Sequence, residues 1–173
     1  MADNADHDVL KAFKMGMETE LHGLDAYLKF AKKTKDETGK NMFIQLAIDE
    51  MDHYRILEKA YTETEVDGDL SKITVSESII QRISPKLEDR DARIKGESGV
   101  DQVNALTTAL AQERRSMELY RQQLGKPISP QAREIFQRLM EMEEAHYDLI
   151  QAELDSINET GFWFQIQEFD LED

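Results

Sequence analysis

The sequence contains no cysteine, only three prolines and only eight glycines among its 173 residues. Without cysteine the chain cannot form disulfides, zinc ribbons or rubredoxin-type iron sites, and it cannot use a thiol as a nucleophile. The scarcity of the two helix breakers, together with abundant Ala, Leu, Glu, Lys, Gln and Met, predicts an all-helical chain. The length suffices for one compact domain with a substantial core.

A long apolar stretch is also missing. No run approaches the ~20 residues that cross a bilayer, and the N-terminal residues lack the apolar core of a signal peptide. We therefore expect a soluble, cytoplasmic protein with no membrane partner. The formal net charge is −15, which argues against nucleic acid as a partner because its phosphates would be repelled. Such a charge suits a protein that collects cations, although an acidic surface also serves solubility.

Two segments of the sequence carry the same polar residues at the same spacing. The first contains Glu20, Tyr27, Glu50 and His53, and the second, with every member 93 positions later, contains Glu113, Tyr120, Glu143 and His146. The spacing predicts two copies of a helix pair. In each copy the first helix carries a lone Glu and the second carries Glu-x-x-His.

Apolar residues at three- and four-residue steps predict four long helices, over about residues 8–37, 40–61, 100–124 and 130–158. Gly39 is predicted to end the first helix in a left-handed turn, and Ser129 and Pro130 to begin the fourth. The short breaks make the helices of each pair antiparallel neighbours. The buried face of the first helix is expected to contain Val9, Leu10, Phe13, Met17, Leu21, Leu24, Tyr27, Leu28 and Ala31.

Residues 62–100 have the composition of a connection, with a short helix predicted over 76–83 whose apolar face is Ile79, Ile80 and Ile83. Such a long crossover places the third helix as in bundles with one long connection; a functional lid is the alternative. We predict an antiparallel four-helix bundle over residues 1–158. The tail, 159–173, contains the aromatic run Phe162 to Phe169. It is expected to pack on the bundle or on a neighbouring subunit, because it would otherwise form a large exposed apolar patch.

The repeated glutamates are predicted to face the core. Residues three, four and seven positions apart share a helix face, and Glu20 shares its face with Phe13, Met17 and Tyr27; the other three glutamates have similar neighbours. Each buried, uncompensated carboxylate would cost several kcal/mol. No Lys or Arg shares the faces of Glu50 and Glu143, and each of these has a His one turn on.

Cations must therefore offset the four carboxylates, and two divalent metal ions would balance their charge. Mixed carboxylate and imidazole ligands suit iron or manganese. A bundle without metal is the alternative. The remaining histidines, His7 and His22, are interpreted as surface residues, since His22 lies roughly 200° around the helix from Glu20.

The chain resembles the rubrerythrins of the ferritin-like superfamily, in which two helices each supply one Glu and the other two supply Glu-x-x-His. The resemblance covers nearly the whole chain outside the crossover, and includes Tyr27 and the run Phe30-Ala31-Lys32-Lys33. It implies two iron ions, with manganese or a mixed pair as alternatives. It further implies that Tyr27 and Tyr120 donate hydrogen bonds to carboxylate ligands, which makes them candidate catalytic residues. The implied ligands are Glu20, Glu50, His53, Glu113, Glu143 and His146.

The sequence departs from typical rubrerythrins in two ways. Their cysteine-ligated rubredoxin domain is absent, so electrons must come from an external donor such as a rubredoxin or a reductase. The second glutamate of their third helix is replaced by Ser116. Because that glutamate is linked to iron movement during peroxide turnover, its absence argues against efficient peroxidase activity.

Three functions follow as hypotheses. In the first, a di-iron centre reduces hydrogen peroxide to water as a defence against oxidative stress. In the second, the same centre is a ferroxidase that oxidises Fe(II) with oxygen or peroxide. In the third, the chain is a helical interaction module that binds a partner through its aromatic tail. We expect a homodimer in each case.

Overall fold

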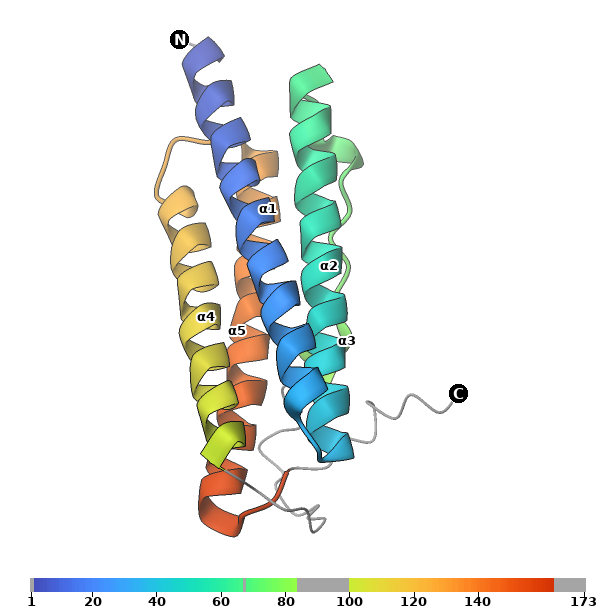
Figure 1. Cartoon of the computed structure of the whole chain (residues 1–173). Helices are drawn as coiled ribbons and strands as arrows, with labels where there is room; N and C mark the ends of the chain where they lie inside the picture. Colours follow the sequence, from blue (N-terminus) through green and yellow to red (C-terminus); the bar gives the residue numbers. More distant parts are fainter. Residues whose placement is uncertain (1, 67, 84–99, 164–173) are drawn as a thin grey trace.

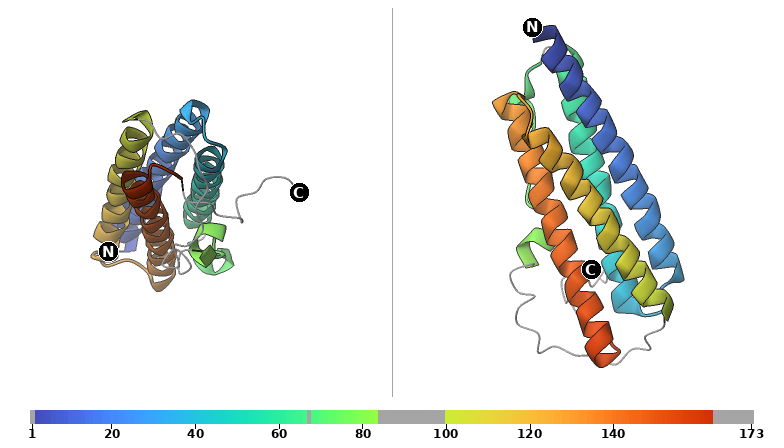
Figure 2. Two further views of the ribbon diagram at one scale, coloured as in Figure 1. Left: turned by 90° about the horizontal axis from the view of Figure 1, so that it is seen from below. Right: turned by 90° about the vertical axis from the view of Figure 1, so that its left-hand side faces the viewer.

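The computed structural model describes residues 2–66, 68–83 and 100–163, and these residues are predominantly helical (Figure 1). Its four long helices lie side by side in two antiparallel hairpins (Figure 2). The helices are α1 (Ala2–Lys33), α2 (Glu37–Val66), α4 (Val100–Leu124) and α5 (Pro130–Thr160). α1 packs chiefly on α2, and α4 chiefly on α5. The predicted ferritin-like four-helix bundle is confirmed. Among the described helices, none has an apolar stretch that could span a membrane.

The connection between the hairpins contains a 3-10 helix, Leu70–Lys72, and the short helix α3, Ile79–Ile83. It returns along the outside of α2, so that α4 runs in the same direction as α2 (Figure 1). α3 packs on α5, and the side chain of Ile80 is fully buried. The other two residues of the predicted apolar face are Ile79 and Ile83, and their side chains lie outside the described part of the chain. Residues 84–99 also lie outside it.

The break between α1 and α2 does not lie at Gly39, and that prediction was wrong. The backbone N–H of Thr34 donates to Phe30 O at 2.9 Å as α1 ends. Asp36 then caps α2 by accepting the Gly39 N–H at 3.1 Å, a role for which Asp is well suited. Gly39 therefore lies in the first turn of α2. The far end of α2 also runs to Val66 instead of residue 61.

Gly39 is needed for packing rather than for chain reversal. A Cβ atom at this position would lie 2.4 Å from Cε2 of Trp163. The indole of Trp163 is 2% exposed and meets the ring of Phe43 edge-on, with centroids 5.9 Å apart. The tail is thus anchored on the bundle at Trp163. Its remaining residues, 164–173, are outside the described ranges.

Two leucines that were predicted to be buried on α1 are exposed: Leu21 is 42% and Leu28 is 51% exposed. The buried stripe instead follows Phe13, Glu20 and Tyr27 at seven-residue steps. Leu21 and Leu28 each lie one residue, or about 100°, around the helix from this stripe. The stripe places the Glu20 carboxylate in the middle of the core, between two aromatic residues.

The start of α5 agrees with the sequence prediction, and its last residue, Thr160, lies two positions beyond the predicted end at about residue 158. Ser129 Oγ accepts the Ala132 N–H at 3.1 Å, and Pro130 is the first helical residue. Gly161 ends the helix in the left-handed conformation, with φ +79° and its N–H bonded to Ile157 O. α5 is consequently fixed at both ends, and Glu143 and His146 lie near its centre.

We predict that Gly39→Ala lowers the free energy of unfolding by about 1–2 kcal/mol, because crowding against the indole outweighs the gain in helix propensity. Chemical denaturation will measure the loss, and the emission of the only Trp will shift to longer wavelength. Gly125→Ala is the matched control, since a Cβ there meets nothing closer than 3.5 Å. Equal stability of the two variants would contradict the packing role of Gly39.

Candidate metal centre

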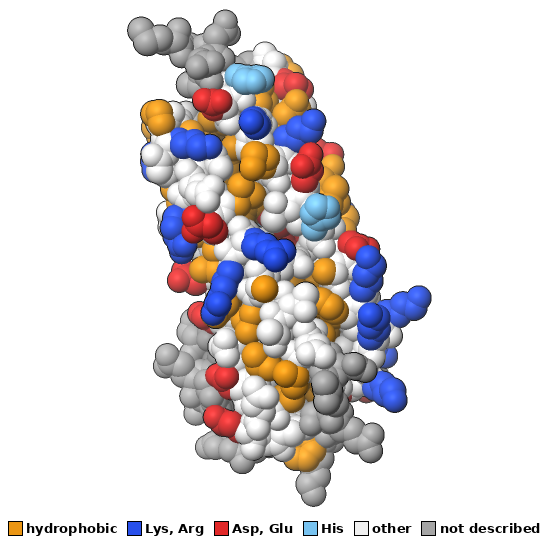
Figure 3. Space-filling model, turned by 60° about the vertical axis from the view of Figure 1, so that its left-hand side comes forward, with side chains coloured by type: hydrophobic (Ala, Val, Ile, Leu, Met, Phe, Trp, Pro, Cys, Tyr) orange, Lys and Arg blue, Asp and Glu red, His pale blue; other side chains and the backbone are white. Residues whose placement is uncertain are grey.

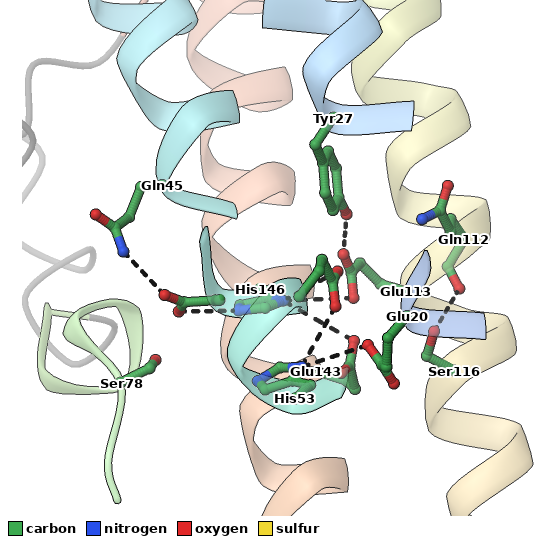
Figure 4. A network of polar contacts seen from close by, with 12 residues as sticks. Glu20, Tyr27, Gln45, His53, Ser78, Gln112, Glu113, Ser116, Glu143 and His146 are labelled. Carbon is green, nitrogen blue, oxygen red and sulfur yellow. Dashed lines mark hydrogen bonds and ion pairs between the residues drawn. The ribbon is translucent and has the colours of Figure 1, made fainter. Parts of the chain in front are cut away.

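Six acidic and imidazole side chains from all four long helices meet at the middle of the bundle (Figure 4). Each helix contributes one or two of these side chains from its buried face, and all six residues are at most 2% exposed. The structure therefore brings together the complete set predicted from the sequence. The set is Glu20 from α1, Glu50 and His53 from α2, Glu113 from α4, and Glu143 and His146 from α5.

The six residues form two overlapping groups in which the possible ligand atoms lie within 4.8 Å of one another. One group adds Glu20 and His53 to a shared pair, and the other adds Glu113 and His146 to the same pair. The shared pair is Glu50 and Glu143. Two neighbouring cations could each have an outer Glu and a His, while the shared carboxylates reach both.

The same nitrogen of each imidazole faces the carboxylates. His53 Nδ1 lies 2.9 Å from Glu143 Oε1 and 3.3 Å from Glu50 Oε2. His146 Nδ1 lies 3.8 Å from both Glu50 Oε1 and Glu113 Oε2. The rings are stacked, with centroids 5.3 Å apart. With the proton on Nε2, each Nδ1 offers a lone pair to a cation.

A bound cation would satisfy the donor atoms of the cluster better than hydrogen bonds among these atoms do. Buried atoms of Glu20, Glu50, Glu113, Glu143 and both imidazoles lack well-directed hydrogen bonds within the described structure. Leaving one buried polar atom unsatisfied costs about 1–3 kcal/mol. The ion pairs found among the described residues join no Lys or Arg to these carboxylates. Oxygen and nitrogen lone pairs gathered in this way are what a divalent metal requires.

Without a cation, the cluster retains protons. Burial raises the pKa of Glu113 to about 8, with a further contribution from the Glu20 charge. Burial and then the neighbouring carboxylates raise the pKa values of Glu50 and Glu143 well above the ordinary range. Burial alone would lower the pKa of His53, but the surrounding carboxylates, Glu143 first, raise it well above its usual value. In the metal-free chain, protons on these groups thus offset the negative charge that a bound metal would otherwise offset.

Two tyrosines hold the outer glutamates through hydrogen bonds that cross between the hairpins. Tyr27 on α1 donates to Glu113 on α4, and Tyr120 on α4 donates to Glu20 on α1. Both tyrosines are fully buried. In each glutamate the Oε1 atom accepts the hydrogen bond from the tyrosine hydroxyl, and Oε2 has no hydrogen bond to a described residue. The tyrosines therefore orient the carboxylates that would complete each metal position.

Asp49 and Gln45 were not predicted from the sequence as site residues, and they support the His146 imidazole at its Nε2 side. Asp49 Oδ2 lies 3.3 Å from His146 Nε2, and Asp49 Oδ1 accepts a hydrogen bond from Gln45 Nε2 at 2.8 Å. Burial would raise the pKa of Asp49, but His146 reverses this effect and lowers it. A carboxylate at Nε2 fixes the proton there and turns Nδ1 toward the site. The available signal was the Gln45–Asp49 pair on one helix face.

The remaining candidates lie where they cannot complete the cluster. Ser116 is buried, and its Oγ has only a long contact, 3.5 Å, with Gln112 O. His7 and His22 are exposed, and histidine side chains are visible on the face shown in Figure 3. Both are therefore surface residues, as the helix geometry predicts.

The fold and the cluster together define a ferritin-like protein with a buried carboxylate and imidazole metal site. A family model described as rubrerythrin matches residues 11–154. The match covers most of the chain, which belongs to the rubrerythrin family. Members of this family are in general di-iron redox proteins, and the buried cluster fits that description. Searches among curated proteins and among solved structures found no match.

We predict that metal reverses the pH dependence of stability. Between about pH 4.5 and 8 the metal-free folded chain binds more protons than the unfolded chain, because the pKa of Glu113 is raised. The raised histidine pKa values act in the same direction, so stability falls as pH rises through this interval. Metal binds the deprotonated ligands, so the stability of the metal-loaded protein should rise as pH rises through the same interval. Thermal unfolding of chelator-treated and reconstituted protein should give opposite slopes; parallel slopes would contradict the assignment.

We predict that Glu50→Ala combined with Glu143→Ala abolishes metal binding. Both proposed cation positions use these carboxylates, so their loss removes ligands from each ion at once. Metal analysis of protein purified without chelator should fall to background. The control is Glu18→Ala with Glu144→Ala, since both residues are exposed neighbours of the cluster in sequence. If the first variant retains its metal, the site lies elsewhere.

Proposed function

We propose that this chain binds two iron ions and reduces hydrogen peroxide to water with electrons from an external donor. The supporting observation is the pair of overlapping carboxylate and imidazole groups that share Glu50 and Glu143. The donor would be a separate protein, such as a rubredoxin or a reductase, because the chain contains no cysteine for an iron–thiolate site of its own. The active form is proposed to be a homodimer in the cytoplasm.

When bound, two ferrous ions would supply the two electrons that convert one peroxide and two protons into two molecules of water. Glu50 and Glu143 are the residues suited to bridge them, since both belong to each ligand group. His53 and His146 present neutral nitrogen donors on one side of the cluster. Glu20 and Glu113 complete the set from the opposite hairpins, with one carboxylate oxygen of each free to turn toward the centre.

The tyrosines are proposed to keep the outer carboxylates in position during the reaction. Burial and then the nearby Glu20 charge raise the pKa of Tyr120 well above its usual value, so its hydroxyl stays protonated and continues to donate to Glu20. The fully buried Tyr27 supports Glu113 in the same way. The Tyr120 hydroxyl is therefore not proposed as a source of the protons consumed by peroxide reduction.

Ferroxidase activity is the second candidate, and Ser116 is the observation that favours it. A serine hydroxyl stands where typical rubrerythrins carry an additional glutamate, so this part of α4 offers no further carboxylate to a metal. A centre built in this way would oxidise Fe(II) and release Fe(III). Manganese in place of one or both irons would also be compatible with the mixed oxygen and nitrogen ligands.

The two candidates predict different products. For a peroxidase, di-ferrous protein should be reoxidised rapidly by one equivalent of peroxide, more rapidly than by oxygen, and should cycle once a reductase is supplied. For a ferroxidase, each chain should convert many Fe(II) ions to Fe(III), well beyond the roughly two ions of the centre, with oxygen and without a reductase. Stopped-flow absorbance and iron analysis distinguish these outcomes. Protein with Glu50→Ala and Glu143→Ala is the control and should do neither.

A further inference from the structure

A pocket of about 410 Å³ lies beside the metal centre, between α2, α5 and the returning connection. Some of its lining residues are exposed, including Arg55, Thr74 and Glu77. Others are buried, including His53 and Met142. The pocket therefore extends from the surface to a residue of the proposed centre. Its volume is ample for several water molecules.

His53 is the only residue of the six-membered cluster that lines this pocket. Its Nδ1 faces the carboxylates, so the ring edge that carries Nε2 is directed to the other side. Nε2 is buried and has no hydrogen-bond partner in the described part of the chain. When Nδ1 binds a metal, Nε2 must carry the proton and requires an acceptor. No described residue supplies this acceptor, and the pocket is a space beside His53 that a small molecule could occupy.

The internal repeat explains why the acceptor is missing at this imidazole alone. At His146, the equivalent Nε2 meets Asp49 at 3.3 Å. The residue 93 positions after Asp49 is Met142, which offers no carboxylate and lines the pocket next to His53. One imidazole thus has a protein acceptor at Nε2, whereas the other has none among the described residues and lines the pocket. The two halves of the chain differ at this point.

The outer wall of the pocket is an ordered part of the connection. Ser78 Oγ accepts the Gln81 N–H, and the Ser78 N–H donates to Gln81 Oε1, both at 3.2 Å. This reciprocal pair is a capping box, and the adjacent Ile80 is fully buried. Figure 4 shows Ser78 on the side of His53 away from the carboxylates. Ser76, Glu77 and Ser78 of the crossover thus line the pocket together with His53.

The charges of the pocket indicate what it can admit. Its lining has three carboxylates, Asp49, Asp52 and Glu77, and two guanidinium groups, Arg55 and Arg82. Arg55 is already paired with Asp52 at 2.9 Å. An anion would meet the excess carboxylate, and a large apolar molecule would leave these groups without solvent. A small neutral molecule with O–H donors and oxygen lone pairs suits both the carboxylates and the Nε2 proton.

We propose that this pocket is the entrance by which hydrogen peroxide and water reach the metal centre, and that the Nε2–H of His53 hydrogen-bonds the entering molecule. The peroxide part of this inference rests on the proposed function, whereas the solvent part does not. His53 acts here by positioning the molecule at the inner end of the pocket.

The first test measures proton exchange in wild-type protein loaded with zinc, a diamagnetic substitute for iron. NMR of protein labelled with ¹⁵N in its histidines will follow the Nε2 protons of His53 and His146. We expect the His53 proton to exchange with water at least about tenfold faster, because a hydrogen bond to Asp49 protects the other proton. Equal exchange rates would overturn the entrance. This test does not depend on redox activity.

The second test blocks the pocket. Because the chain has no cysteine, Ile48→Cys creates a single labelling site at a residue that lines the pocket and is 45% exposed. A pyrenyl label there should slow reoxidation of the di-ferrous protein by peroxide by about tenfold or more, whereas a methylthio label should change the rate by less than about twofold. Leu21→Cys, at a 42% exposed residue outside the pocket, is the matched control.

The outcomes separate the two proposals. If both labels at position 48 leave the rate unchanged, peroxide enters elsewhere and the inference fails. If wild-type di-ferrous protein does not react with peroxide, the proposed function fails, and the proton-exchange contrast still decides whether the pocket connects His53 to solvent. Metal content and thermal unfolding of the labelled proteins will show that a slower rate is not caused by loss of the centre.

Discussion

Four carboxylates buried within a few ångströms of one another are the constraint on which the rest of this structure depends. Their mutual repulsion and loss of hydration oppose folding, and each costs several kcal/mol unless a cation or a proton offsets it. The raised pKa values of Glu50, Glu113 and Glu143 express the same opposition. The bundle tolerates the cluster because helix packing and the crossed tyrosine hydrogen bonds fix it in one arrangement. The arrangement of the core therefore depends on these charges as much as on apolar contacts.

The principal features of the site were predictable from the sequence because they depend on local rules. Helical periodicity placed Glu20 and Glu50 among apolar neighbours, and the 93-residue repeat identified their counterparts. The start of α5 followed from Ser129 and Pro130, whose preferences act within one turn. The positions of the four helices and the inward direction of the glutamates thus came from short-range chemistry. The proposed ligands needed only the further assumption that four such helices share one core.

The remainder could not be predicted because it depends on contacts between distant residues. Gly39 resembles a helix terminator, but its use is to admit the indole of Trp163, which is 124 positions later in the sequence. Leu21 and Leu28 fit an apolar pattern that is wider than the stripe the neighbouring helices cover. Asp49 resembles one more surface acid beside Glu50, and only the packing of α2 against α5 brings it to His146. Tertiary proximity decided each case.

The Asp49 contact also means that the two halves of the centre are chemically unequal. An imidazole hydrogen-bonded to a carboxylate is a more basic donor and is more tightly oriented. The position beside His146 should therefore hold its cation more strongly than the position beside His53. At limiting metal, the proposed position beside His146 would fill before the position beside His53. Two bound iron ions would then differ in redox potential. A repeat that looks symmetric in sequence would thus give two bound cations unequal sites.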